Sequence, residues 1–249
     1  MTLELTVSPD FSPEHIAGWY VFNTWLQRKL GVRIHLELYE DFSAQRQAIA
    51  ADKVDLIYAN PYDAAMLVRE KGFVAIAAPR DKPDEVVIAV PVDSPVQSVE
   101  DLLPGLRLAV TRDPDVNLIG MILLESADLN RDNTRTQQVS TYIVLARALL
   151  QGKADCGFFL KEAFDDLSAP IRRQLRPVMT SQISLVHHVL LVGPRCAELR
   201  ESLQTLVLGM AEPGSDGRAT LQALGLSGWD RQDQEDTEFM IDLMDTLMV

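Results

Sequence analysis

Two cationic side chains stand at predicted strand-to-helix junctions, where they could bind a small anionic molecule. Arg112 lies just before a predicted helix, and its guanidinium could hold a carboxylate or phosphate through two parallel hydrogen bonds. It could equally pair at the surface with Asp113 or Asp115, a contact that contributes little stability. Lys161 occupies a similar junction, although a long cationic side chain usually ends in water. Both are candidate ligand-binding residues, and Arg112 is the stronger candidate.

Aromatic side chains occupy comparable positions. Phe42 and Tyr142 stand one hundred positions apart, each just ahead of a predicted helix. They could form two walls around a ligand, or each could make the apolar contact that fixes a helix start. Tyr62, which follows Asn60 and Pro61 at a strand-to-helix turn, could form a hydrogen-bonding wall. Asn60 could bind the ligand or cap the helix, because proline suits the first helical turn.

The histidines do not suggest a metal site. His187 and His188 are adjacent in a predicted strand, so their side chains point to opposite faces, and one of them, His187, could face a ligand. Adjacent histidines on a strand cannot easily chelate one metal ion, and His15 and His35 are remote in sequence. We expect no metal site and no cofactor. The sequence also contains no GxSxG, GxGxxG, P-loop, HExxH or EF-hand motif, so nothing positive points to an enzyme.

Charge and composition exclude several classes of partner. The 249 residues include 23 Lys and Arg against 36 Asp and Glu, which gives a formal net charge of −13. Nucleic acids and anionic membranes bind basic surfaces, so we expect neither as a partner. Hydrogen-bond donors within the site would have to hold an anionic ligand despite repulsion from this net negative charge. Cys156 and Cys196 form no CxxC motif and are expected to be free thiols.

The sequence predicts no membrane segment. No stretch approaches the roughly 18 consecutive apolar residues of a membrane span. The N-terminus lacks a charged segment followed by an apolar one. The protein is therefore expected to be periplasmic if a leader was trimmed before Met1, and cytoplasmic otherwise. We expect a monomer.

An internal repeat indicates how these residues are positioned. Residues 42–61 and 142–161 align without a gap, and each stretch predicts a helix, a turn, a short apolar strand and a new helix. The matched positions include Lys53 with Lys153 and Asp55 with Asp155. Each copy is a βαβα unit, which implies parallel strands joined by right-handed crossovers.

The predicted elements extend the repeat over most of the chain. The first copy predicts strands at 3–7, 32–38, 54–58 and 73–78 and helices at 13–30, 43–52 and 61–71. The second copy predicts strands at 106–110, 134–139 and 155–159 and helices at 115–127, 141–151 and 161–168. Two Val-rich runs, 85–92 and 185–192, suit paired strands, and helices follow at 195–210, 215–224 and 234–247.

These elements predict an α/β fold with two βα lobes, joined by two crossing hinge strands, and a ligand cleft between the lobes. Lobe one would be 1–84 with 193–249, lobe two 93–182, and the hinge strands about 85–92 and 183–192. Ligands of open α/β sheets bind at the carboxyl ends of the strands, and pockets favour domain interfaces. That rule adds Ser8, Phe11 and Thr111 to the candidate ligand-binding residues.

Five sequence strings, in a fixed order, span nearly the whole chain. They are Leu30-Gly-Val32 followed by a strand, Val54-Asp-Leu-Ile-Tyr-Ala-Asn-Pro-Tyr62, Ser98-Val-Glu-Asp-Leu-Leu-Pro-Gly105, Ala148-Leu-Leu-Gln-Gly-Lys-Ala-Asp155 and Gly217-Arg-Ala-Thr-Leu-Gln-Ala-Leu-Gly-Leu-Ser-Gly-Trp229. They resemble the phosphate/phosphite/phosphonate-binding family of ABC-transporter solute receptors. The resemblance implies the type 2 periplasmic-binding-protein fold and a binding function.

The departures from that family fall where ligand contacts are expected. Members that bind phosphonates carry a Ser-Thr-Ser-Gly-like run after Asp-Pro at the head of a lobe-two helix. Residues 111–120 here have one hydroxyl at the entrance and two carboxylates. At the other matched positions, Tyr142 replaces the family's histidine, and Leu160, beside Lys161, replaces its aspartate. Phe42 replaces the family's first tyrosine, and Tyr62 or Asn60 matches its second tyrosine. The resemblance thus implies a retained scaffold with most of the oxyanion cradle missing.

We therefore expect a solute-binding protein that closes two lobes on a small polar or anionic ligand, other than a simple alkylphosphonate, for an ABC transporter or a sensor. An enzyme on the same fold, of the menaquinone- or thiamine-precursor type, and a non-binding interaction module are the alternatives. The expected ligand-binding residues are Ser8, Phe11, Phe42, Asn60, Tyr62, Thr111, Arg112, Tyr142, Lys161 and His187.

Overall fold

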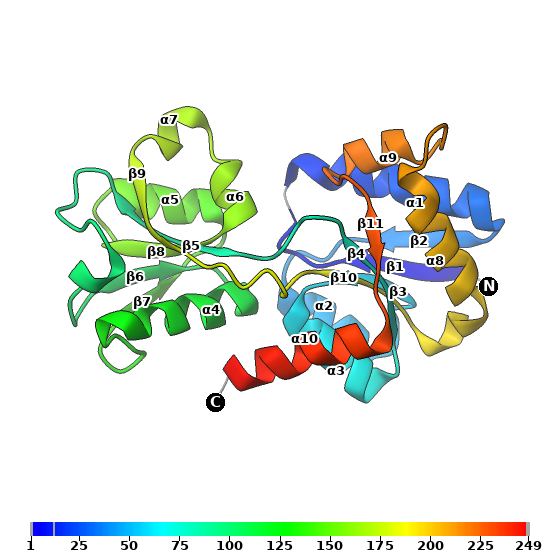
Figure 1. Cartoon of the computed structure of the whole chain (residues 1–249), viewed down its shortest axis with the longest axis horizontal. Coiled ribbons are helices and arrows are strands. Elements are labelled where there is room, and N and C mark those ends of the chain that lie inside the picture. Colours follow the sequence, from blue (N-terminus) through cyan, green and yellow to red (C-terminus); the bar gives the residue numbers. More distant parts are fainter. Residues whose placement is uncertain (1, 12, 248–249) are drawn as a thin grey trace. The chain divides into compact units, whose positions relative to one another are not determined.

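The computed structural model describes residues 2–11 and 13–247, which divide into two compact units (Figure 1). Unit 1 contains the chain up to Pro83 and again His187–Asp245, and unit 2 is mainly Asp84–Val186. Each unit is built on its own mixed sheet. The predicted α/β class with two lobes is confirmed.

Unit 1 has a mixed sheet in the strand order β11-β4-β10-β3-β1-β2. The strands are β1 (Thr2–Val7), β2 (Arg33–Glu37), β3 (Leu56–Ala59), β4 (Val74–Pro79), β10 (Val189–Val192) and β11 (Trp229–Arg231). Strand β1 pairs in parallel with β2 and β3, whereas β10 runs antiparallel between β3 and β4. The helices are α1 (Ile16–Leu30), α2 (Phe42–Ala50), α3 (Pro61–Lys71), α8 (Arg200–Leu208), α9 (Arg218–Ala223) and α10 (Gln234–Leu247).

Apolar side chains of unit 1 fill both faces of its sheet. Strand β3 shows this because successive side chains point to opposite faces. Leu56 and Tyr58 join an apolar cluster with Trp19 and Phe22 of α1. Ile57 and Ala59 join a second cluster that contains residues of α3 and α10. Helices α1, α8 and α9 accordingly lie on one side of the sheet and α2, α3 and α10 on the other (Figure 1).

Unit 2 repeats this plan with a sheet in the order β7-β6-β8-β5-β9. The strands are β5 (Val86–Pro91), β6 (Arg107–Val110), β7 (Arg135–Gln138), β8 (Cys156–Leu160) and β9 (Leu175–Thr180). Strand β6 is parallel to β7 and β8, and β5 is antiparallel to β8 and β9. The helices are α4 (Pro114–Leu124), α5 (Tyr142–Leu150), α6 (Lys161–Asp165) and α7 (Ala169–Arg172).

The two Val-rich runs do not pair with each other as hinge strands, which corrects the expectation. Strand β5 lies inside the sheet of unit 2 and β10 inside that of unit 1, and nearly all of their side chains are buried. Such continuous apolar runs suit central strands that are covered on both faces. The second strand also starts later than 183, because Ser184 has a left-handed φ of 60° and its N–H donates to the Glu85 carboxylate at 2.8 Å. The chain changes unit after Pro83 and after Val186.

The internal repeat is confirmed by matching backbone hydrogen bonds. The Lys53 N–H donates to the Ala48 carbonyl at 3.0 Å, and the Lys153 N–H donates to the Ala148 carbonyl at 2.9 Å. The left-handed residues of the two turns are Asp52 and Gly152. Helices α2 and α5 therefore end in the same type of turn, which leads into β3 and β8.

Both cysteines are free thiols, as expected, and both are buried. Burial raises the pKa of the Cys196 thiol to about 11 and that of Cys156 further still. The thiols are thus protonated at neutral pH and behave as small apolar side chains.

Candidate ligand-binding site

Four of the helices that follow parallel strands, α2, α3, α4 and α5, begin with caps from the protein's own side chains, whereas, among the described residues, α1 and α6 have no side-chain cap. A cap side chain accepts a hydrogen bond from a backbone N–H in the first helical turn. The caps are Asp41 to Ala44 at 2.9 Å, Asn60 to Asp63 at 2.8 Å, Asp113 to Val116 at 3.2 Å and Thr141 to Val144 at 3.2 Å. Backbone N–H groups at a helix start can bind an oxyanion. In these four helices, one such N–H group already donates to the protein's own cap side chain.

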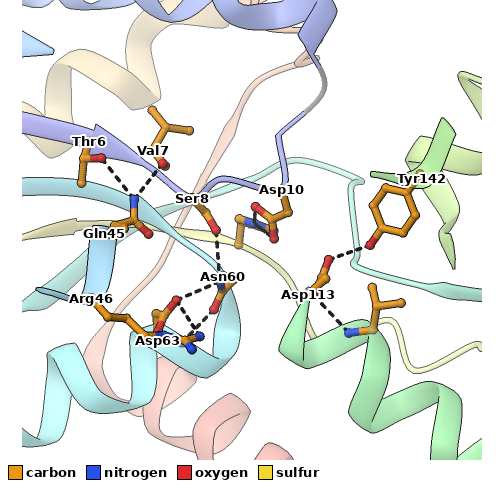
Figure 2. Close-up of polar contacts among 12 residues, drawn as sticks. Thr6, Val7, Ser8, Asp10, Gln45, Arg46, Asn60, Asp63, Asp113 and Tyr142 are labelled. Carbon is orange, nitrogen blue, oxygen red and sulfur yellow. Dashed lines mark hydrogen bonds and ion pairs between the residues drawn. The ribbon is translucent and has the colours of Figure 1, made fainter. Parts of the chain in front are cut away.

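Asn60 links the ends of β1 and β3 in unit 1. It is fully buried, and its amide nitrogen donates to the Ser8 hydroxyl oxygen and to the Asp63 carboxylate, both at 3.0 Å (Figure 2). Its amide oxygen is the acceptor that caps α3. Both N–H donors of Asn60 and its carbonyl therefore have partners inside unit 1, which is the capping role allowed by the sequence.

Asp10 and His188 continue this network. The His188 Nε2 atom lies 3.1 Å from an Asp10 carboxylate oxygen, and the imidazole stacks on the Tyr58 ring with centroids 5.0 Å apart. The Ser8 hydroxyl also hydrogen-bonds to Asp10. Burial acts to raise the pKa of Asp10, but the charge of His188 and hydrogen bonds from His188 and Ser8 outweigh it and hold the pKa below its ordinary value. Asp10 is thus an ionised carboxylate inside unit 1 at neutral pH.

Arg46 connects the predicted aromatic residues of unit 1. Its guanidinium pairs with the buried Asp63 carboxylate at 2.5 Å and lies 4.9 Å from the Tyr62 ring centroid and 5.5 Å from that of Phe42. Cations bind aromatic faces at such distances. Phe42 is only 8% exposed, whereas Tyr62 is 42% exposed. Of these two rings, Tyr62 is the one open to a ligand.

Asp113 and Tyr142 meet in unit 2. The Tyr142 hydroxyl donates to an Asp113 carboxylate oxygen at 2.8 Å, and the other oxygen of Asp113 caps α4 (Figure 2). The Tyr142 ring stacks on Phe159 with centroids 6.0 Å apart. Thr111 is buried beside them, and its carbonyl accepts a hydrogen bond from the Asn117 side chain at 2.9 Å. The ends of β6 and β7 thus share a polar cluster that contains two of the predicted residues, Thr111 and Tyr142.

The remaining predicted residues are placed differently. Arg112 is exposed at the start of α4. The Lys161 ammonium lies 2.5 Å from Asp165 one helical turn away, with the side chain half exposed. Phe11 packs against the apolar core of unit 1. His187 is half-buried, with Nδ1 3.1 Å from the His188 carbonyl, so that His188 and not His187 joins the Ser8 network.

Sequence reasoning overlooked several residues of these networks. Asp113 precedes Pro114 at a helix start, and Asp63 stands three residues after Asn60, so both followed a recognisable helix-start pattern. Arg46 and Asp10 carried no local signal, because their partners are remote in sequence.

The described residues contain neither a metal cluster nor a membrane-spanning helix. Within residues 2–11 and 13–247, no group of three or more His, Cys, Asp or Glu side chains is arranged to hold a metal ion. Over the same part of the chain, no helix has both the length and the apolar character needed to cross a membrane.

Comparisons with known proteins support the expectation that the chain is a binding protein. Residues 5–237 match the family described as ABC transporter, phosphonate, periplasmic substrate-binding protein. A comparison with curated protein sequences gives no match.

Solved structures resemble the chain over almost its whole length. PhnD1 from Prochlorococcus marinus (MIT 9301), in complex with methylphosphonate, has a TM-score of 0.85 at 13% identity and covers 99% of this chain and 98% of its own. A binding protein component of an ABC phosphonate transporter from Pseudomonas aeruginosa has a TM-score of 0.75 at 18% identity, covering 98% and 87%. The alkanesulfonate-binding protein SsuA from Xanthomonas axonopodis pv. citri, bound to MOPS, has a TM-score of 0.69 at 15% identity, covering 99% and 93%. At these identities the likeness shows the fold.

Proposed function

Because the chain belongs to the phosphonate-binding family of periplasmic substrate-binding proteins of ABC transporters, we propose that it binds a small polar or anionic molecule of the phosphonate/oxyanion-like class, other than a simple alkylphosphonate. The family is one of binding proteins, so turnover of the ligand is not part of the function. The ligand would be supplied to a transporter permease or to a sensor protein.

The observation that carries this proposal is the polar cluster of Asp113 and Tyr142 at the start of α4. In a receptor for simple oxyanions, neutral hydroxyls and free N–H groups hold the ligand. Here a buried carboxylate, only 3% exposed, stands at that helix start and accepts from the Tyr142 hydroxyl. A site of this kind favours a ligand that offers hydrogen-bond donors.

We propose ligand contacts at the strand ends of each unit taken by itself. In unit 1, Tyr62 would contribute, with the buried Ser8 and Asn60 and the apolar Phe11 and Phe42 behind it. In unit 2, the contacts would be Thr111, Arg112, Tyr142 and Lys161. His187 stays a candidate from the sequence, and closure of the two lobes on the ligand stays a prediction, which small-angle scattering with and without ligand would test.

The first experiment is a thermal-shift screen of the purified protein. The panel contains phosphate, phosphite, alkylphosphonates, sulfate, small carboxylates, amines and thiamine-pathway pyrimidines. A ligand present at 100 times its Kd adds roughly 2.7 kcal/mol of stability, which raises Tm measurably. A hit outside the simple alkylphosphonates supports the proposal. A shift with methylphosphonate alone contradicts the assigned ligand class, and no shift at all favours the interaction-module alternative.

A double variant tests the assigned residues. Arg112→Ala with Tyr142→Ala should abolish the ligand-induced shift. The ligand-free Tm should fall as well, because Tyr142→Ala removes the stack on Phe159 and the hydroxyl donor to Asp113, so the shift is measured relative to the variant's own ligand-free Tm. The matched control is Arg131→Ala with Tyr20→Ala, which removes the same two residue types at exposed positions outside the assigned contacts. An unchanged ligand affinity in the first double variant would rule out this assignment.

A further inference from the structure

A buried carboxylate, that of Glu85, lies just after the point where the chain passes from unit 1 into unit 2. Glu85 is only 6% exposed, and its side chain accepts hydrogen bonds from one short segment, residues 181–184. The donors are the Ser181 hydroxyl, the Ile183 N–H at 3.2 Å and the Ser184 N–H at 2.8 Å. Successive backbone N–H groups that turn toward one anion form a concave arrangement called a nest. Residues 181–184 therefore fold around the Glu85 carboxylate, and we call this arrangement the Glu85 nest.

The backbone of Ser184 indicates that the nest is held in place by its carboxylate. Ser184 has a φ of 60°, in the left-handed region that residues other than Gly, Asn and Asp seldom adopt. Such a conformation costs free energy and persists only where the surrounding contacts favour it. Glu85 supplies that contact, because it accepts from both the Ile183 and the Ser184 N–H groups.

Main-chain contacts fix Glu85 and Ser181 to the sheet of unit 2. The Glu85 carbonyl accepts from the Lys161 N–H at 2.7 Å, at the end of β8. The Val86 N–H, at the start of β5, donates to the Ser181 hydroxyl oxygen at 2.8 Å, and the Ser181 N–H donates to the Val86 carbonyl at 2.9 Å. The segment that leads out of unit 2 is thus attached to the strand that leads into it.

The connection from unit 2 back to unit 1 is short as a result. On the side of unit 2, the Val186 carbonyl accepts from the Asp84 N–H at 2.8 Å. On the side of unit 1, the His188 ring lies 3.1 Å from the Asp10 carboxylate. A single residue, His187, separates Val186 from His188. Few backbone dihedral angles are therefore left to change in this connection.

The connection from unit 1 into unit 2 has the same form. Arg80 is held in unit 1, because its N–H donates to the Gly228 carbonyl at 3.0 Å and its carbonyl accepts from the Ser227 hydroxyl at 3.2 Å. Asp84 is held in unit 2 by its bond to Val186. Residues 81–83 lie between these two points, and Pro83 has its φ fixed by the ring.

We propose that Glu85 is a positioning residue that confines movement between the two units to residues 81–83 and His187. The Glu85 nest joins both connections to the sheet of unit 2, so that they move with this unit as one block. Hinge motions use a few residues at the ends of elements, which absorb the change in φ and ψ. The proposal rests on the binding function proposed above, which needs such a movement, but it does not depend on which ligand binds.

The first readout is backbone hydrogen exchange in Glu85→Ala, followed by NMR. Exchange at the Ile183 and Ser184 N–H groups should be at least about tenfold faster than in the wild-type protein, because hydrogen bonds to charged acceptors are the stronger ones. Glu85→Gln is the conservative variant. Its side-chain oxygen can still accept from a backbone N–H, so its exchange rates should lie between those of the wild-type protein and Glu85→Ala.

The second readout is one that a loss of stability alone would not change. Spin labels at Arg28→Cys and Arg147→Cys, exposed positions in α1 and α5, report the distribution of distances between the units. Cys156 and Cys196 are buried, so they do not compete for the label. In the folded, ligand-free full chain, Glu85→Ala should broaden this distribution relative to the wild-type protein, and Glu85→Gln should broaden it less.

The matched control is Asp101→Ala. The Asp101 carboxylate accepts from two successive backbone N–H groups of the same unit, those of Gln97 at 2.9 Å and Ser98 at 3.0 Å. The control removes the same type of contact away from both connections, so it should leave the distance distribution unchanged. Equal broadening in the control would show a general loosening of unit 2 and would overturn the proposal.

Two other results also overturn it. Faster exchange with an unchanged distance distribution shows that Glu85 orders residues 181–184 without restricting movement between the units. Unchanged exchange shows that Glu85 does not hold the nest. If Glu85→Ala does not fold, Ser184→Val opens the nest from its other side, because a β-branched residue rarely adopts a left-handed φ, and an unchanged distribution in that variant decides against the proposal. These measurements contain no ligand, so their failure is distinct from a failure of the ligand screen.

Discussion

Asp55 and Asp155, one hundred positions apart, make the same pair of contacts in their own units. The Asp55 N–H donates to the Glu4 carbonyl at 2.9 Å, and its carboxylate accepts from the Glu4 N–H at 2.9 Å. The Asp155 N–H donates to the Arg107 carbonyl at 2.8 Å, and its carboxylate accepts from the Arg107 N–H at 2.9 Å. Each aspartate thus clamps the turn before one strand to the neighbouring parallel strand.

The two clamps should differ in strength because their burial differs. The Asp55 side chain is 2% exposed and also pairs with Arg195 at 2.8 Å, whereas Asp155 is 42% exposed. Asp55→Ala should lower the free energy of unfolding by about 2 to 3 kcal/mol, since it removes a buried carboxylate that accepts from the part-buried Glu4 N–H and from Arg195. Asp155→Ala should cost at most about 1 kcal/mol. Urea unfolding of both variants measures this, and equal losses would contradict the clamp interpretation.

Acid should weaken unit 1 through Asp10. Its pKa in the folded protein lies below the ordinary value of 3.8, so the stabilisation is fully present above pH 4 and is lost as the pH falls through the folded value. The Tm difference between the wild-type protein and Asp10→Asn should therefore be largest at neutral pH and should shrink below about pH 4. Melting curves between pH 7 and pH 3 provide the measurement, and a difference that does not vary with pH would exclude this role.

Gly18 permits the close approach of α1 and α9. A Cβ at this position would lie 2.1 Å from the Ala223 carbonyl oxygen, a backbone atom that cannot simply rotate away. Gly18→Ala should lower the free energy of unfolding by about 1 to 3 kcal/mol. The control is Gly209→Ala, where nothing lies within 4 Å and φ is −74°, so this change should be neutral or slightly stabilising. Similar losses in both variants would argue against the close packing.

Arg69 of α3 attaches the acidic helix α10. It contacts Glu238 at 3.3 Å, Asp242 at 2.5 Å and also Asp245. These are partly exposed pairs, so Arg69→Ala should cost only about 1 kcal/mol. The cost should fall at 1 M salt, because the Debye length is then about 3 Å. Thermal melting at low and high salt tests this, with Lys161→Ala as the control for a single exposed pair; a salt-independent loss would point to packing instead of charge.

Tyr142→Phe separates the hydroxyl of Tyr142 from its ring. The ring can still stack on Phe159, while Asp113 loses the hydroxyl donor. The variant should lose about 1 kcal/mol of stability. Its affinity for a ligand found in the screen should fall about tenfold if the hydroxyl orients Asp113 toward that ligand. Calorimetry provides the affinity, and unchanged binding would remove Tyr142 from the assigned contacts.

Local signals explain what could be predicted of the site. Asn60 was a candidate cap because Pro61 follows it, and the structure places its side-chain oxygen on the Asp63 N–H. Asp113 with Pro114 carried the same signal, although the sequence interpretation gave it only as a partner of Arg112. Asp10 and His188 could not be paired in advance, since 178 positions separate them and neither residue type specifies the other.

The sequence by itself determined the α/β class, the duplicated helix–turn–strand segment and, to within one residue, the starts of α2, α3, α4 and α5, because each depends on hydrophobic periodicity or on residues within one turn of each other. The helices predicted from 13 and 195 begin as α-helices only at Ile16 and Arg200, after short 3-10 turns. Only the tertiary structure decided that β5 and β10 belong to different sheets and that internal carboxylates hold the strand-end donors. A buried apolar run suits any central strand, so its pattern does not identify its neighbours. Hydrogen-bond partners at strand ends depend on which loops the sheets bring together, and that information is distributed over the whole chain.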